Sequence, residues 1–163
     1  EQLKLANLTF AAPDVGSTNR VREIASYFNA EMVICDKHRK RANEIASMVV
    51  IGDVTDRDIV LIDDICDTGG TLAKAAGLLK EKGARSVRAL CTHPVLSGKA
   101  YENIENSVLE ELIVCDTIPL KQESAKIRAL SVADLFAIAI RNAYENKSIT
   151  SLFIHSQLRG RDK

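Results

Sequence analysis

The sequence predicts an α/β fold in which a parallel sheet is flanked by helices on both faces. Apolar runs of strand length recur between amphipathic stretches of helical length, which is the alternation of βαβ units. Near-continuous apolar runs such as Ile59–Ile62 (IVLI) are typical of strands that are covered on both faces. At 163 residues the chain fits one globular domain.

Strands and helices can be placed along the chain from these patterns. The apolar runs predict strands at Leu8–Ala12, Met32–Asp36, Met48–Gly52, Ile59–Asp63, Val87–Thr92, Leu112–Cys115 and Ile127–Leu130. The amphipathic stretches predict helices at Thr18–Phe28, Thr71–Lys82, Gly98–Ile104 and Val132–Tyr144. Gly83 closes the second helix, where a C-terminus favours a left-handed residue. We expect one domain over residues 1–153, followed by a loosely held polar tail at 154–163.

The composition excludes several classes of function. Lysine and arginine total 22 against 22 acidic residues, so no net charge draws the domain to nucleic acid or an anionic membrane. We find no apolar stretch of about 18 residues and no secretory signal, and expect a cytoplasmic protein. A zinc site or disulfide framework is not expected, because the cysteines are scattered: Cys35, Cys66, Cys91 and Cys115.

The strongest local signal is IVLIDDICDTGGTLAKAAGLL at residues 59–79, which predicts a buried strand, a short glycine-containing loop and a helix. In open α/β sheets, ligands bind outside the carboxyl ends of the strands, where Asp63 and Asp64 would emerge. The backbone N–H groups of a tight loop that enters a helix N-terminus favour a phosphate. The loop residues are Asp67, Thr68, Gly69, Gly70 and Thr71.

These residue types suit a sugar phosphate. Gly69 and Gly70 allow close approach of the backbone to an anion, while the hydroxyls of Thr68 and Thr71 add donors. The carboxylates would accept hydrogen bonds from sugar hydroxyls or reach Mg²⁺ through its water shell. An alternative is a plain strand–turn–helix junction with Asp67 as N-cap, which leaves the acidic pair unexplained. The sequence contains neither GxxxxGK[ST] nor GxGxxG, so a P-loop or Rossmann site lacks its motif.

The segment DDICDTGGTL resembles the phosphoribosyl pyrophosphate-binding motif shared by type I phosphoribosyltransferases and ribose-phosphate pyrophosphokinases. The Asp-Asp opening favours the pyrophosphokinases, since the transferases more often have Glu-Asp there. Further segments resemble that family in the family's order, up to Phe153: APDVGSTNRVREIA, DKHRKR, CTHPVLSGKAYENIENS, ELIVCDTIPL, LSVADLFAIAI and SITSLF. Ser17 and Thr18 depart from it, because the family commonly has Gly and an apolar residue there.

The resemblance implies a type I phosphoribosyltransferase-like fold and a specific reaction. Ribose-phosphate pyrophosphokinases transfer diphosphate from MgATP to C1 of ribose 5-phosphate and release AMP. The similarity reaches only the second half of the family's usual length; the first half carries most ATP-binding residues and a metal-binding His. We therefore expect the chain to be the ribose 5-phosphate-binding half and inactive alone. The family also implies a homo-oligomer that uses ATP as co-substrate and Mg²⁺ as cofactor.

The resemblance assigns roles to residues outside the loop. Lys37 and Arg39 match a catalytic K-x-R pattern that the family carries on a mobile loop, and Arg39 also matches a substrate-binding position. Without the resemblance, the basic run 37–41 is typical of a solvated basic surface or of a nuclear localisation patch. Asp14 is implied to be a magnesium ligand, although it could simply cap the helix that follows. His93 is predicted to be a hydrogen-bonded structural residue at a strand end.

Two other functions fit parts of the sequence. A phosphoribosyltransferase would need a hood or a base-specific pocket, and no segment of the sequence predicts one. A non-catalytic regulatory relative would show degraded loop residues, whereas the DTGGT segment, Lys37 and Arg39 are intact.

Overall fold

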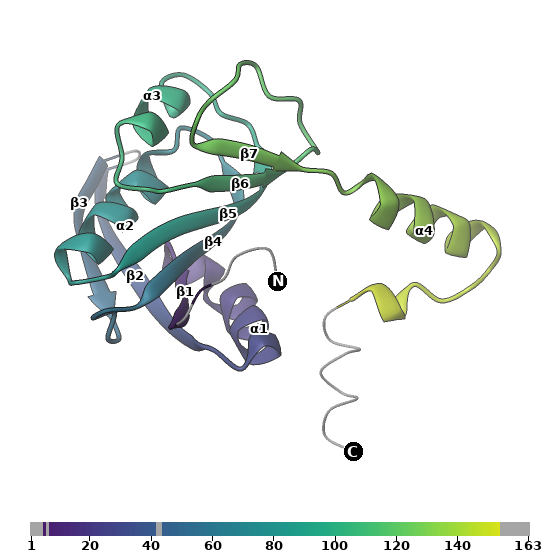
Figure 1. Cartoon of the computed structure of the whole chain (residues 1–163), viewed down its shortest axis with the longest axis horizontal. Coiled ribbons are helices and arrows are strands. Elements are labelled where there is room, and N and C mark those ends of the chain that lie inside the picture. The colour runs from purple at the N-terminus through teal and green to yellow at the C-terminus, as the bar shows by residue number, and fades with distance from the viewer. Residues whose placement is uncertain (1–4, 6, 42–43, 154–163) are drawn as a thin grey trace.

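The computed structural model describes residue 5, residues 7–41 and residues 44–153 (Figure 1). Within these residues the chain forms one seven-stranded sheet with the order β3-β2-β1-β4-β5-β6-β7. The strands are β1 (Leu8–Ala12), β2 (Glu31–Arg41), β3 (Glu44–Ile51), β4 (Asp58–Cys66), β5 (Ser86–Pro94), β6 (Leu112–Cys115) and β7 (Ile127–Leu130). The predicted α/β class is confirmed, and β1, β6 and β7 have the predicted bounds.

Three of the four helices in the described residues lie between strands of the chain and cover both faces of the sheet, and the fourth follows the last strand. The helices are α1 (Thr18–Phe28), α2 (Gly70–Glu81), α3 (Ala100–Glu105) and α4 (Ala133–Tyr144), with short 3-10 turns at Val15–Ser17 and Thr150–Leu152. α1 lies against one face, whereas α2 and α3 lie against the other (Figure 1). Gly83 follows α2 with a φ of 95°, as the C-terminal signal predicted.

The predicted parallel sheet is confirmed, with one antiparallel pair at its edge. β2 and β3 pair antiparallel, with Ile34 opposite Ile51 and Lys37 opposite Met48, so they form a hairpin. The predicted strand Met32–Asp36 is also too short, because β2 continues through the basic run to Arg41. Charged residues are tolerated on a hairpin at the edge of a sheet, so a hydrophobic pattern does not detect this extension.

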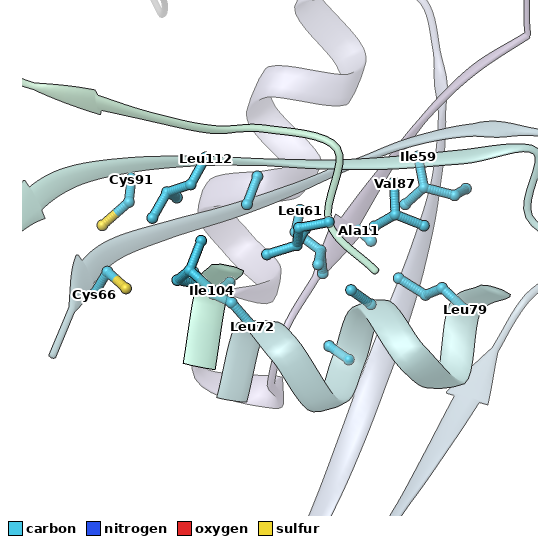
Figure 2. Packing of buried hydrophobic residues seen from close by; sticks show 14 of the residues in the cluster. Ala11, Ile59, Leu61, Cys66, Leu72, Leu79, Val87, Cys91, Ile104 and Leu112 are labelled. Carbon is cyan, nitrogen blue, oxygen red and sulfur yellow. The ribbon is translucent and has the colours of Figure 1, made fainter. Parts of the chain in front are cut away.

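β4 is the central element of the core, and both of its faces are buried. Ile59 and Leu61 pack against α2 and α3, together with Leu72, Leu79 and Ile104 (Figure 2). Val60 and Ile62 pack on the opposite side, in a second cluster with Phe10, Val21 and Ala25. The IVLI run is therefore covered on both faces, as predicted. This packing fixes the strand that carries the acidic pair.

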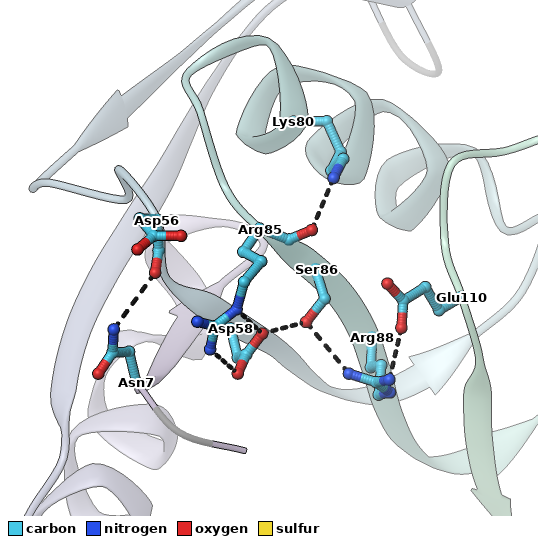
Figure 3. A network of polar contacts seen from close by, with 8 residues as sticks. All are labelled: Asn7, Asp56, Asp58, Lys80, Arg85, Ser86, Arg88 and Glu110. Atoms are coloured by element: carbon cyan, nitrogen blue, oxygen red, sulfur yellow. Dashed lines mark hydrogen bonds and ion pairs between the residues drawn. The ribbon is translucent and has the colours of Figure 1, made fainter. Parts of the chain in front are cut away.

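A polar network joins the amino ends of β4 and β5 (Figure 3). The buried carboxylate of Asp58 accepts hydrogen bonds from Arg85 Nε at 3.0 Å and from Ser86 Oγ at 2.7 Å. Ser86 Oγ also accepts from Arg88, whose guanidinium pairs with Glu110 at 2.5 Å. These charged and polar groups are paired with one another, so the network holds the amino ends of β4 and β5 together.

α4 departs from the rest of the domain. It follows β7 at the edge of the sheet and projects away from it (Figure 1). None of its residues is buried. Over the described ranges, the chain has no helix with the length and apolar character needed to cross a membrane.

Candidate sugar-phosphate site

The acidic residues meet where the strand order reverses. β1 pairs in parallel with β2 on one side and with β4 on the other, so the carboxyl ends of all three strands share one edge. Asp14 follows β1, while Asp63 and Asp64 lie in the last part of β4. Ligands of open α/β sheets bind in the crevice at such a reversal. The structure thus brings Asp14 toward the Asp63–Asp64 pair, which is distant from it in the sequence.

Arg20 supplies the cation for this acidic group. It lies in the first turn of α1, and its Nη2 is 2.7 Å from Asp64 Oδ2, while its Nη1 is 3.9 Å from Asp63 Oδ1. The Asp63 side chain is 18% exposed and that of Asp64 is 51% exposed. The backbone N–H of Asp64 also donates to Asp63 Oδ1 at 3.0 Å. The Asp64 carboxylate is therefore open to solvent, and that of Asp63 is partly enclosed.

The pKa values of the two carboxyl groups are shifted in opposite directions. Burial raises the pKa of Asp63 to about 6, and the negative charges of Asp14 and Asp64 act in the same direction. Burial also acts to raise the pKa of Asp64, but the Arg20 charge and hydrogen bonds outweigh it, so the pKa of Asp64 is lowered. A cation or a set of hydroxyl donors in the crevice would relieve the repulsion at Asp63.

Asp14 fits the role of a partial magnesium ligand. Its Oδ1 accepts the N–H of Ser17 at 3.1 Å, so it does cap the short turn before α1, as the alternative interpretation predicted. Its charge still contributes to the raised pKa of Asp63. Among the described residues no three His, Cys, Asp or Glu side chains form a metal site. Mg²⁺ is commonly held by one or two carboxylates together with phosphates and water, and Asp14 could supply one such carboxylate.

The phosphate loop, residues 67–71, leads directly from β4 into α2. Gly69 is the N-cap of α2 with a φ of 71°, a left-handed conformation that residues with a Cβ rarely adopt. No side chain caps the helix. The first N–H groups of a helix have no partner within the helix, so these amides are available to an anion. Asp67 and Thr68 are exposed, and Gly70 and Thr71 are half-buried.

The alternative role of Asp67 as N-cap is wrong. Its carboxylate accepts a hydrogen bond from Ser97 Oγ in the loop after β5. Because Gly69 occupies the N-cap position, the helix starts two residues later than that alternative requires. The open helix N-terminus and the acidic pair lie at one end of the same strand, as the sequence predicted.

Comparison with known proteins gives the family. The sequence pattern of the phosphoribosyl synthetase-associated domain matches residues 17–154. The chain belongs to this family. A curated relative, ribose-phosphate pyrophosphokinase of Campylobacter jejuni, is 53% identical over 148 residues, which are 91% of this chain and 48% of that protein. The chain spans about half the length of the curated relatives it matches.

Solved structures agree with this assignment. The crystal structure of phosphoribosylpyrophosphate synthetase from Mycobacterium smegmatis matches with a TM-score of 0.78 at 33% identity, over 86% of this chain and 46% of that chain. Adenine phosphoribosyltransferase from Thermoanaerobacter pseudethanolicus matches with a TM-score of 0.51 at 17% identity, over 68% of this chain and 70% of that chain. The second likeness concerns the fold alone. The predicted resemblance to ribose-phosphate pyrophosphokinases is confirmed.

The structure places the backbone of Lys37 and Arg39 in β2 rather than in a loop. β2 is parallel to β1, and its pairing with β1 ends at Ile34 opposite Ala12, so both residues lie beyond the carboxyl edge that carries Asp14. Their side chains lie outside the described part of the structure, as do residues 154–163, the predicted tail. The roles of Lys37 and Arg39 stay predictions.

His93 makes the hydrogen bond expected of a structural residue. Its Nδ1 is 2.9 Å from Thr117 Oγ1, and that hydroxyl donates to the Thr92 carbonyl at 3.0 Å. Since the Thr117 proton is used in this way, Nδ1 must carry the proton that His93 donates. Cys66 and Cys91 lie nearby in the core, where burial raises the pKa of their thiols to about 11 and about 12. Neither thiol is a nucleophile at neutral pH.

Sequence reasoning missed three residues at this site. Arg20 contacts the acidic pair, while Ser97 and Asn103 contact the phosphate loop. The pair Asp63–Asp64 has no cation in its own segment, which is a signal that a basic residue must come from elsewhere. For Ser97 and Asn103 no comparable signal exists, because their contacts depend on how α3 packs under α2.

Proposed function

We propose that this chain is the sugar-phosphate-binding half of a ribose-phosphate diphosphokinase. The complete enzyme transfers diphosphate from MgATP to C1 of ribose 5-phosphate, giving phosphoribosyl pyrophosphate and AMP. One observation carries this proposal: an uncapped helix N-terminus and an acidic pair lie at the two ends of a single loop. Membership of the phosphoribosyl synthetase-associated family and the relatives named above support it.

The phosphate loop binds the 5-phosphate. Amides at the start of α2 point along the helix axis toward the loop, and the helix dipole favours a dianion there. The hydroxyls of Thr68 and Thr71 add two donors from side chains. Asp67 accepts a hydrogen bond from Ser97, so its second oxygen is available to a sugar hydroxyl. These contacts fix one end of the substrate.

Asp63 and Asp64 bind the ribose ring. Both carboxylates accept hydrogen bonds from sugar hydroxyls, and hydroxyl donors offset the repulsion between the two acids. Arg20 keeps Asp64 ionised, so Asp64 remains an acceptor over the whole physiological pH range. With the phosphate and the ring both held, C1 is oriented toward the crevice between β1 and β4.

The ATP phosphates lie on the β1 and β2 side of this crevice. Lys37 and Arg39 neutralise charge on the transferring diphosphoryl group and on the departing AMP. Asp14 would hold Mg²⁺ together with the phosphates, and the ion would supply charge neutralisation when bound. The C1 oxygen forms a bond to the β-phosphorus as the bond from that phosphorus to the α–β bridging oxygen breaks. AMP leaves with the bridging oxygen, and the proton of the C1 hydroxyl passes to solvent water.

α4 is the docking element for the other half of the enzyme. Its large apolar side chains are strongly exposed, including Phe136 at 57%, Ile140 at 67% and Tyr144 at 88%. Exposed apolar patches of this kind mark interfaces, and the chain spans only 48% of a relative that is 53% identical to it. Part of the relative's remaining length therefore covers α4. The homo-oligomeric state and the cytoplasmic location stay predictions.

Neither alternative function has comparable support. The likeness to a phosphoribosyltransferase is confined to the fold, at 17% identity, whereas the relatives near 50% identity are named pyrophosphokinases. A non-catalytic relative would not need an uncapped α2 beside an acidic pair. The pyrophosphokinase reaction accounts for both features.

An AMP-release assay with saturating MgATP and ribose 5-phosphate tests this function. The 163-residue chain alone should produce no AMP, because orientation contributes several kcal/mol to such transfers and, by the family resemblance, most ATP-binding residues lie in the half that this chain does not match. Addition of the segment of the Campylobacter jejuni relative that this chain does not match should restore turnover. Phe136→Asp should prevent the restoration by disrupting α4 docking, and Lys37→Ala should lower the restored rate by orders of magnitude. Robust turnover by the chain alone would overturn the proposal.

A further inference from the structure

The segment between β5 and the end of α3 packs against the phosphate loop. We call residues 96–104 the brace. Each residue from Cys66 to Gly69 is contacted by it, although the two segments are about 30 positions apart in the sequence. The brace therefore contacts the end of β4 and the first three residues of the loop.

Three successive carbonyls, one at the end of β4 and two in the loop, accept hydrogen bonds from the brace. The bonds join Leu96 N to Cys66 O at 3.0 Å, Ser97 N to Asp67 O at 2.9 Å, and Asn103 Nδ2 to Thr68 O at 2.8 Å. In a planar trans peptide, a carbonyl and the N–H that follows it point in opposite directions. Each of the amides of Asp67, Thr68 and Gly69 therefore points away from the brace atom that binds the preceding carbonyl. The Gly69 amide is directed at the Cys66 thiol, whereas Asp67 and Thr68 are exposed.

Side chains of the brace add two further contacts. Ser97 Oγ donates to Asp67 Oδ1, which orients the carboxylate of the exposed loop residue. Ile104 lies under Gly69, where an added Cβ would be 3.2 Å from the Ile104 side chain. Figure 2 shows Ile104 between Leu72 and Cys66, so the brace is anchored in the core while Ser97 and Asn103 reach out of it. A rigid base thus holds a polar, exposed loop.

We infer that Ser97 and Asn103 are positioning residues for the 5-phosphate, a role that rests on the proposed function. They act through Asp67 and Thr68 and do not touch the substrate. An exposed loop without these bonds would sample several conformations, and ordering it on binding would cost entropy. Preorganised amides avoid that cost, so removal of either side chain weakens ribose 5-phosphate binding.

The test measures ribose 5-phosphate affinity of the 163-residue chain by calorimetry, together with amide hydrogen exchange of residues 67–71. Ser97→Ala and Asn103→Ala should each weaken binding about tenfold and speed exchange of the loop amides, while the unfolding temperature stays nearly constant. Ser97→Thr keeps the hydroxyl and should restore affinity. Ser131→Ala is the control, since Ser131 Oγ accepts the N–H of Ala133 at 3.2 Å and lies outside both the brace and the loop.

A double-mutant cycle separates positioning from a general structural role. If Ser97 acts through the Asp67 carboxylate, Ser97→Ala should have little further effect in an Asp67→Ala chain. Additive losses would show that Ser97 acts by another route and would overturn its role. Unchanged affinity and unchanged exchange in both brace variants would overturn the inference as a whole.

Failure of the proposed function has a different signature. In that case the unaltered, folded chain would not bind ribose 5-phosphate at all. Hydrogen exchange would then still decide whether the brace orders the loop, since Ser97→Ala and Asn103→Ala would either speed exchange of residues 67–71 or leave it unchanged.

Discussion

The guanidinium of Arg20 lies 2.7 Å from the carboxylate of Asp64, a residue 44 positions further along the chain. The contact joins the first turn of α1 to the carboxyl end of β4, across the point where the strand order reverses. It makes the acidic pair asymmetric, because Arg20 reaches Asp64 closely and Asp63 only at 3.9 Å. Asp64 is thereby held ionised beside a carboxylate with a raised pKa.

Arg20→Met should raise the pKa of Asp64, because it removes the opposite charge that outweighs burial. Carboxyl chemical shifts measured by NMR over a pH titration would follow this change. Arg22→Met is the control, since Arg22 lies on the same helix and bonds Asn19 at 3.0 Å instead. An Asp64 pKa that is equal in the unaltered chain and in Arg20→Met would contradict the role of this contact.

Asp63→Asn should stabilise the fold at neutral pH and not in acid. The folded-state pKa of Asp63 is raised from 3.8 to about 6, so its ionisation costs stability above pH 6, and that cost falls to nothing below about pH 4. Denaturant unfolding at pH 8 should show a gain of about 1–3 kcal/mol, which vanishes at pH 3.5. Asp64→Asn should instead destabilise at pH 8, because its pKa is lowered in the folded state. A loss of stability at pH 8 in Asp63→Asn would contradict this account.

The two loop glycines should differ in their effect on stability. Gly69→Ala should cost about 1–3 kcal/mol, because its φ is 71° and its Cβ would lie 3.3 Å from the carbonyl oxygen of Ala100. Gly70→Ala should change stability by less than about 0.5 kcal/mol, since its Cβ would make only an ordinary contact with Thr68 at 3.7 Å. Thermal unfolding of both variants measures the two changes in stability. Equal losses would mean that the loop conformation differs from the one described.

Thr18→Val should raise the unfolding temperature. The Thr18 hydroxyl is buried and has no hydrogen-bond partner within the described part of the chain, which is a cost that Val removes. A gain of about 1–2 kcal/mol corresponds to several degrees for a domain of this size. Ser17→Ala should act in the opposite direction, because Ser17 Oγ donates to the Asp14 carbonyl at 2.9 Å. A lower unfolding temperature in Thr18→Val would show that the hydroxyl has an unseen partner.

The strands on which the site depends could be predicted because their signals are local. The run IVLI alternates between two cores, and Gly83 stops α2, so periodicity and turn chemistry sufficed for β4 and α2. β2 was predicted too short because the pairing of a basic run with β3 is a tertiary contact. No pattern in the residues 37–41 alone indicates it.

The candidate site could be predicted only in part, for the same reason. Asp63, Asp64 and the phosphate loop lie in one continuous segment, so the sequence groups them. Arg20 and Ser97 reach that segment through the packing of α1 and the β5–α3 connection. Their partners are 44 and 30 positions away, and single-sequence patterns carry no information about such pairs.

Calorimetric titration of the folded chain with ribose 5-phosphate tests the central claim most directly. We expect saturable binding at one site per chain, much weaker binding of ribose without its phosphate, and a large loss of affinity in Asp67→Ala and in Gly70→Val. Gly70→Val acts by blocking the approach of the phosphate to the backbone. Unchanged affinity in both variants would contradict the account and show that the phosphate binds elsewhere.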